Sequence, residues 1–291
     1  MNKNCAPFSA LFLLLVAFQV MAASCDNPRP LRFALVPKSN AEAQLAQYRP
    51  LIQQLEKALG RRVAVVNTPS YGTVIEGLLA DSIDLAELGP ASYAIAINRG
   101  AEITAFATFS LRKGTYTDSA SAYRSLLIVR RDKGFDKIEQ LRGKTLSLTD
   151  PASTSGALLP RKAVSQLTGT LLESYFQRVT FAGSHDRAID AVQTNLVDAA
   201  FVSSTRLDEA LRRGTILPDE IGVLWQSSPI PYDPVVLSQR LCPELASRIR
   251  KVFLGDTSAL DGMFRELDVN GFVPASDAQY RDIRELFVTR P

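Results

Sequence analysis

Three polar segments, each lying between an apolar run and a helical pattern, carry residues that could bind an anion. The first, residues 150–156, reads Asp-Pro-Ala-Ser-Thr-Ser-Gly and places the hydroxyls of Ser153, Thr154 and Ser155 at a predicted helix start. The first N–H groups of a helix have no partner within it, and the helix macrodipole adds positive charge there. Such an end binds anions without a lysine. N-capping by Ser153 is the alternative, but one hydroxyl is enough for a cap.

The second segment, residues 183–186, reads Gly-Ser-His-Asp and contains His185, the only histidine of the chain. An imidazole beside a helix start can donate a hydrogen bond to an oxyanion, and its charge is expected to respond to pH near neutrality. The alternative interpretation is a histidine in an N-cap turn that bonds to the nearby backbone.

The third segment, residues 87–93, reads Glu-Leu-Gly-Pro-Ala-Ser-Tyr and places Ser92 and Tyr93 at another helix start. Tyr71 opens the preceding predicted helix and could reach the same place. For each tyrosine taken singly, packing in the core is the competing interpretation.

Alternating strand-like and helix-like patterns position these segments. Short apolar runs predict strands, and apolar residues at helical spacing predict helices. In the first half the predicted strands are 31–36, 63–66 and 83–86, with helices at 41–59 and 71–80. In the second half the predicted strands are 126–129, 145–148, 179–181 and 197–202, with helices at 138–141, from 152 to about 167, and 186–194. This rhythm predicts an α/β fold with mostly parallel sheets.

The repeated pattern predicts two Rossmann-like lobes joined by two crossings, as in periplasmic binding proteins. Lobe 1 is expected to comprise residues 28–121 and 227–291, and lobe 2 residues 122–226. The Ser- and Pro-rich stretch 227–234 is the second crossing. Ligands of such sheets bind beyond the carboxyl ends of the strands, where all three polar segments lie. A shared site in a cleft that closes by hinge motion is therefore expected.

The N-terminus predicts export. Residues 1–24 contain Lys3, an apolar run from Ala10 to Val20 and small residues at the end, the order of a secretory signal peptide. Cys25 and Cys242 remain after cleavage. In an oxidising compartment they can form a disulfide. Lipidation of Cys25 and a free thiol are the alternatives. The predicted location is the periplasm.

The sequence resembles the phosphate/phosphite/phosphonate-binding proteins of ABC importers, a group within the type II periplasmic binding proteins. The resemblance rests on the segments above and on residues 123–129, 141–144 and 197–200, in order along the chain. In that family the hydroxyl triplet and the histidine hold the oxyanion, and two tyrosines and a downstream aspartate close over it. The matching residues here are Ser153, Thr154, Ser155, His185, Tyr71, Tyr93 and Asp233, with Ser92 beside them.

One departure from the family pattern bears on the ligand. Aminophosphonate binders of the family carry a carboxylate shortly after the strand that holds the Asp-Ala-Ala motif. Here the stretch 201–205 reads Phe-Val-Ser-Ser-Thr and contains no acid. Burying an unpaired ammonium is costly. The expected ligand is therefore phosphate, phosphite or a small alkylphosphonate, with arsenate as a related oxyanion.

The resemblance implies an ABC permease as partner, and a membrane sensor kinase is the alternative. The net charge of +3, without a basic run longer than a pair, argues against nucleic-acid binding. One histidine and two distant cysteines do not give the spacing of a metal site. A secreted hydrolase is a remote alternative, since no Gly-x-Ser-x-Gly elbow occurs. We expect a monomer that is not an enzyme and needs no cofactor.

Overall fold

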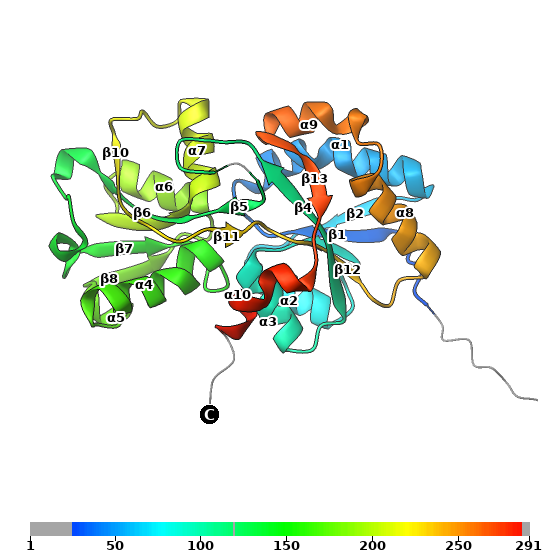
Figure 1. Cartoon of the computed structure of the whole chain (residues 1–291), viewed down its shortest axis with the longest axis horizontal. Coiled ribbons are helices and arrows are strands. Elements are labelled where there is room, and N and C mark those ends of the chain that lie inside the picture. The colour runs from blue at the N-terminus through cyan, green and yellow to red at the C-terminus, as the bar shows by residue number, and fades with distance from the viewer. Residues whose placement is uncertain (1–24, 119, 287–291) are drawn as a thin grey trace, which may run out of the picture.

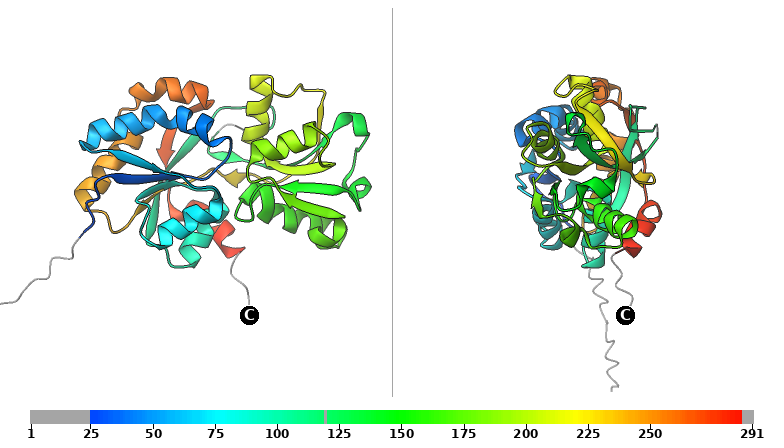
Figure 2. Two further views of the ribbon diagram at one scale, coloured as in Figure 1. Left: turned by 180° about the vertical axis from the view of Figure 1, so that it is seen from behind. Right: turned by 90° about the vertical axis from the view of Figure 1, so that its left-hand side faces the viewer.

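The computed structural model describes residues 25–118 and 120–286, so the predicted signal peptide lies outside the described residues. Two α/β lobes lie side by side, each built on a central sheet (Figure 1). Seen from behind, helices flank the sheet of each lobe and the connecting segments run between them (Figure 2). Within the described residues, no helix is long and apolar enough to cross a membrane.

The sheet of lobe 1 has six strands in the order β13-β4-β12-β3-β1-β2. β1 is parallel to β2 and β3, whereas β12 and β13 are antiparallel to their neighbours. The strands are β1 (Leu31–Leu35), β2 (Val63–Val66), β3 (Leu85–Glu87), β4 (Ile103–Leu111), β12 (Val235–Ser238) and β13 (Val269–Pro274). The helices are α1 (Ala41–Leu59), α2 (Tyr71–Leu79), α3 (Pro90–Asn98), α8 (Pro243–Leu254), α9 (Asp261–Glu266) and α10 (Arg281–Glu285).

The sheet of lobe 2 has five strands in the order β10-β6-β9-β7-β8. β7 is parallel to β8 and β9, and β6 is antiparallel to β9 and β10. The strands are β6 (Ser125–Arg130), β7 (Thr145–Leu148), β8 (Arg178–Phe181), β9 (Ala199–Ser203) and β10 (Ile221–Gln226). The helices are α4 (Leu159–Thr168), α5 (Leu172–Tyr175), α6 (His185–Gln193) and α7 (Ser204–Arg213), and a π-helical turn at Thr154–Leu158 leads into α4.

The two crossings between the lobes pair with each other. β5 (Ala122–Tyr123) lies on the way out to lobe 2 and β11 (Ile230–Pro231) on the way back, and they form a short antiparallel ribbon. The residues after the second crossing form β12 and β13, which complete the lobe 1 sheet. The two crossings therefore lie side by side where the chain passes between the lobes.

Apolar side chains cover both faces of each sheet. Phe33 and Leu35 of β1 pack in the cluster under α1 and α8, whereas Ala34 packs in the cluster under α2 and α3. Neighbouring residues of a strand point to opposite faces. β1 is thus buried on both sides, as expected for a strand with parallel neighbours. This buried sheet gives the loops at its carboxyl edge a rigid base.

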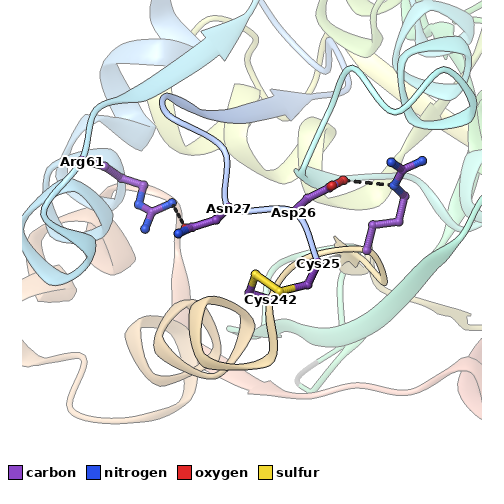
Figure 3. Close-up of a disulfide and its surroundings, with 6 residues drawn as sticks. Cys25, Asp26, Asn27, Arg61 and Cys242 are labelled. Carbon is purple, nitrogen blue, oxygen red and sulfur yellow. Dashed lines mark hydrogen bonds and ion pairs between the residues drawn. A yellow bond between two sulfur atoms is a disulfide. The ribbon is translucent and has the colours of Figure 1, made fainter. Parts of the chain in front are cut away.

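A disulfide joins Cys25 to Cys242, with a Cα–Cα distance of 4.7 Å (Figure 3). It ties the segment before β1 to the start of α8. Backbone bonds from Asp26 N to Arg240 O and from Cys242 N to Asp26 O support the same junction. On the other side, Arg61 Nη1 donates to Asn27 Oδ1 over 2.7 Å. Of the three alternatives for Cys25, the structure shows the disulfide.

Candidate ligand-binding site

A small pocket, the oxyanion pocket, lies between the lobes, with an empty volume of about 290 Å³. Its walls come from the carboxyl ends of strands in both lobes and from the two crossings. The lining residues are Lys38, Tyr71, Gly89, Tyr123, Ser153, Thr154, His185, Ser203, Thr205, Tyr232 and Asp233. The structure therefore brings together five of the residues expected from the sequence: Tyr71, Ser153, Thr154, His185 and Asp233.

The helix start after β7 offers backbone donors to this pocket. Ser153 is the N-cap residue, and its Oγ accepts from Gly156 N over 3.1 Å. Across the described residues, the N–H groups of Thr154 and Ser155 have no hydrogen-bond partner. The buried Ser155 hydroxyl also lacks one, although Ser155 does not line the pocket. Unpaired buried donors cost free energy, so an anion that accepts from these groups would be bound favourably.

His185 is presented as a neutral donor. Its Nδ1 accepts from the backbone N–H of Ser203 over 3.1 Å, which leaves the proton on Nε2. Burial, with the nearby charges of Arg206 and Lys38, lowers the pKa of His185 to about 3. The expectation that its charge responds near neutral pH is therefore wrong, because the imidazole is neutral at pH 7.

The pKa of His185 leads to a test by pH. We expect His185→Gln, which keeps a donor group, to retain the shape of the wild-type affinity curve between pH 5.5 and 8. Folding lowers the pKa of His185, so the unfolded chain takes up a proton more readily than the folded protein. The contribution of His185 to the free energy of unfolding is therefore fully present above the unfolded pKa of about 6.5 and is lost as pH falls toward 3. Between pH 7 and pH 4.5, the free energy of unfolding measured with denaturant should therefore fall more in the wild type than in the variant. A flattened affinity curve in His185→Gln would restore the titrating role.

Two tyrosines in the pocket keep their protons. Burial raises the pKa of Tyr71 and the pKa of Tyr123, and the charge of Asp233 adds to the effect on both. Their hydroxyls therefore remain donors at neutral pH. Tyr71 was expected from the sequence. Tyr123 was missed, because its position depends on β5 pairing with β11 in the crossing ribbon.

The helix starts of lobe 1 contact lobe 2 beside the pocket, which Tyr71 and Gly89 also line. Tyr71 N donates to Asp150 Oδ2 over 3.2 Å, and Ala91 N donates to Thr154 Oγ1 over 2.7 Å. The Ser92 hydroxyl donates to Ala152 O over 3.0 Å. These three bonds hold the lobes together beside the pocket. Ser92 thus serves lobe contact, and its predicted contact with the ligand is corrected.

Tyr93 also lies outside the oxyanion pocket. Its hydroxyl donates to Asp277 Oδ1 over 3.0 Å, and its ring packs edge-on against Tyr280 at a centroid distance of 5.3 Å. A helix does begin within the predicted segment 87–93, at Pro90. However, Tyr93 points into the core of lobe 1, so the predicted role of this side chain at the ligand is corrected.

Lys38 is the main pocket residue that the sequence analysis missed. Its Nζ lies 2.6 Å from Asp233 Oδ2 and also contacts Glu87 Oε1. Although burial disfavours the charged ammonium, the charges of Asp233 and Glu87 raise the pKa of Lys38 well above its usual value. Burial raises the pKa of Asp233 to about 6, while Lys38 lowers it and Glu87 raises it further. The only signal in the sequence is a lysine just after the first strand.

A family model described as "ABC transporter, phosphonate, periplasmic substrate-binding protein" matches residues 33–280. The chain belongs to this family. The phosphate-import protein PhnD of Mycolicibacterium smegmatis is 28% identical over 277 residues, covering 89% of this chain and 85% of the relative. The phosphonates-binding periplasmic protein of Escherichia coli is 29% identical over 285 residues, covering 96% and 82%.

A solved structure of the same kind agrees with the fold. The crystal structure of a binding protein component of an ABC phosphonate transporter from Pseudomonas aeruginosa gives a TM-score of 0.80 at 25% identity, covering 90% of this chain and 86% of that chain. The predicted fold class, a type II periplasmic binding protein of two α/β lobes, is confirmed.

Among the described residues that line the pocket, negative charge is limited to one carboxylate, which a lysine partly neutralises. In the stretch after β9, Ser203 and Thr205 line the oxyanion pocket and bring no acid to it. Asp233 does line the pocket, but its partner is Lys38. The one carboxylate among the lining residues is thus paired with a lysine of the chain itself.

Proposed function

We propose that this chain captures a small phosphorus oxyanion in the oxyanion pocket and delivers it to an ABC importer. The candidates are phosphate, phosphite and a small alkylphosphonate. The family and the names of the relatives, which refer to phosphate import and phosphonate binding, support this ligand class. The observation that carries the proposal is the convergence of neutral donors from both lobes on one small pocket between them.

The donors fit a compact oxyanion. Lobe 2 offers the N–H group of Thr154 and Nε2–H of His185, and lobe 1 offers the hydroxyl of Tyr71. Hydrogen bonds to a charged oxygen are stronger than neutral ones. Contacts from both sides exist only when the lobes are closed, so binding favours closure.

Asp233 gives the pocket a means to select protonated oxyanions. A pKa of about 6 means that its carboxylate carries a proton only part of the time near neutrality. As an anion it accepts from a P–OH group, and when protonated it donates to a bare oxygen. Sulfate carries no proton at neutral pH, so it must bind the less populated protonated form. Weaker binding of sulfate than of phosphate is expected.

We expect no hydrolase activity from this pocket. The Nδ1 of His185 is occupied by the Ser203 N–H, and a pKa of about 3 makes the imidazole a weak base at pH 7. The family is one of substrate-binding transport proteins. Since the members of this family serve ABC transporters, an importer is the preferred partner over a sensor kinase.

The ligand class is tested by calorimetry and thermal shift with phosphate, phosphite, methylphosphonate, arsenate and sulfate. A ligand that binds the folded state raises its stability by mass action. We expect phosphorus oxyanions to stabilise the protein more than sulfate. If none of them binds while an unrelated solute does, the proposed function is wrong.

The site is tested with Tyr123→Phe, which removes one hydroxyl from the pocket wall. We expect the affinity for the best phosphorus oxyanion to fall roughly 10- to 100-fold, as for loss of a hydrogen bond to a charged group. Tyr175→Phe is the matched control, because that hydroxyl donates to Ile138 O inside lobe 2. Equal affinities for the two variants would remove Tyr123 from the site.

A further inference from the structure

A second cavity adjoins the oxyanion pocket in the cleft. This outer cavity has an empty volume of about 690 Å³, against about 290 Å³ for the oxyanion pocket. Its walls include residues of α1, β4, α7 and β13, such as Gln47, Phe109, Arg212 and Val269. Lys38, Thr205 and Tyr232 line both cavities. These three residues therefore form the partition between a space fit for a small anion and a larger space beyond it.

Lys38 is fixed within this partition. Its ammonium contacts both Glu87 and Asp233 and lies 5.2 Å from the centroid of the Tyr232 ring. The side chains of Lys38, Glu87 and Asp233 are only 12%, 2% and 9% exposed. Tyr48 donates its hydroxyl to the other oxygen of Glu87. The carboxylates of Glu87 and Asp233 are thus held in place, and both are bound by the ammonium of Lys38.

An aminoalkylphosphonate would bring the same chemical group to the same place. Its ammonium, like that of lysine, offers three donors and one positive charge. With Lys38 present, a ligand ammonium would meet a like charge and two carboxylates that already have a partner. It would then be buried without compensation. A methyl group or a hydrogen on phosphorus meets no such penalty.

We propose that Lys38 is the residue that sets ligand specificity in this chain. Its ammonium occupies a carboxylate subsite that would otherwise accept a cationic substituent, and its side chain separates the oxyanion pocket from the outer cavity. Removing it opens a path from phosphorus to the outer cavity, lined at its start by the two carboxylates that have lost their cation. Specificity then shifts from small uncharged substituents to ligands with an ammonium arm.

This inference rests on the proposed function, and its test uses Lys38→Ala with three ligands measured by calorimetry at pH 7.5. The ligands are methylphosphonate, 2-aminoethylphosphonate and ethylphosphonate, the last a measure of added length without charge. We expect the wild type to prefer methylphosphonate. In the variant, the affinity for 2-aminoethylphosphonate should rise about 10-fold or more relative to methylphosphonate. The relative gain for ethylphosphonate should be smaller.

Two further variants separate charge, space and folding. Lys38→Met keeps much of the bulk of the side chain without its charge, so we expect no comparable gain for 2-aminoethylphosphonate. Lys38→Ala leaves two buried carboxylates unpaired, which destabilises the fold. Lys38→Ala/Glu87→Gln keeps the net charge of the cluster and an acceptor for Tyr48. It should show the same shift in specificity if the single variant does not fold.

Each outcome decides one point. A wild type that binds no phosphorus oxyanion overturns the proposed function. A wild type that binds methylphosphonate, with a folded Lys38→Ala or Lys38→Ala/Glu87→Gln that keeps the wild-type ligand ratio, overturns the role of Lys38 alone. If the relative affinity for 2-aminoethylphosphonate rises as much in Lys38→Met as in Lys38→Ala, the bulk of the Lys38 side chain does not separate the two cavities.

Discussion

Cys25→Ser/Cys242→Ser is expected to lower the free energy of unfolding by about 2–5 kcal/mol. The disulfide joins residues 217 positions apart in the sequence, so it restricts the unfolded chain strongly. In the folded state it also holds the segment before β1 against the start of α8. Equilibrium denaturation of the two proteins under oxidising conditions measures the difference.

Two controls test whether the difference comes from the disulfide itself. Reductant should bring the wild type close to the double variant and leave the double variant unchanged. Affinity for the best oxyanion should be the same in both proteins, because neither cysteine lines the oxyanion pocket. If the denaturation midpoints of wild type and double variant coincide, the disulfide does not stabilise the fold.

Gly156→Ala is expected to weaken oxyanion binding about 10- to 100-fold and to cost about 1–3 kcal/mol of stability. A Cβ at this position would lie 1.7 Å from Thr149 Oγ1 and 2.7 Å from Thr149 Cβ. Thr149 is buried directly after β7, and its N–H donates to Gly156 O. The helix start must therefore move away from the strand, and the N–H groups of Thr154 and Ser155 move with it.

Gly262→Ala is the control for this variant. Gly262 lies in α9 with open space around the position of a Cβ. Alanine there should leave binding unchanged and add up to about 1 kcal/mol of stability. Thr149→Ala/Gly156→Ala should regain part of the lost affinity, since two of the three clashing atoms are removed. Wild-type affinity in Gly156→Ala would show that the helix start does not need this close approach.

Local patterns in the sequence were sufficient for much of the fold. α1 follows the predicted range, because its apolar residues recur at helical spacing between Asn40, its N-cap, and Gly60. β2 and β7 also match their predicted ranges. By contrast, β4 and α7 were missed. In β4 small alanines interrupt the apolar run, and α7 is mostly polar, with Leu207 as its buried apolar residue.

The candidate site divides in the same way. Ser153, Thr154 and His185 could be identified because a helix start is a local feature and each follows a strand. Lys38 and Tyr123 could not, because their places depend on contacts between segments far apart in the chain. Tyr93 shows the opposite error. The helix start lies in the predicted segment, but a shift of one or two residues within a helical turn decides whether a side chain faces the cleft or the core.

The three bonds between the lobes, Tyr71–Asp150, Ala91–Thr154 and Ser92–Ala152, are made by protein groups alone. Part of the free energy that drives closure is therefore supplied by the protein itself, which raises the closed population of the empty form. An empty closed molecule must reopen before an anion can enter, which slows capture. It also presents the permease with the outline of a loaded molecule. Stronger bonds between the lobes thus slow the release of a bound anion, but they also increase unproductive binding of the empty protein to the permease.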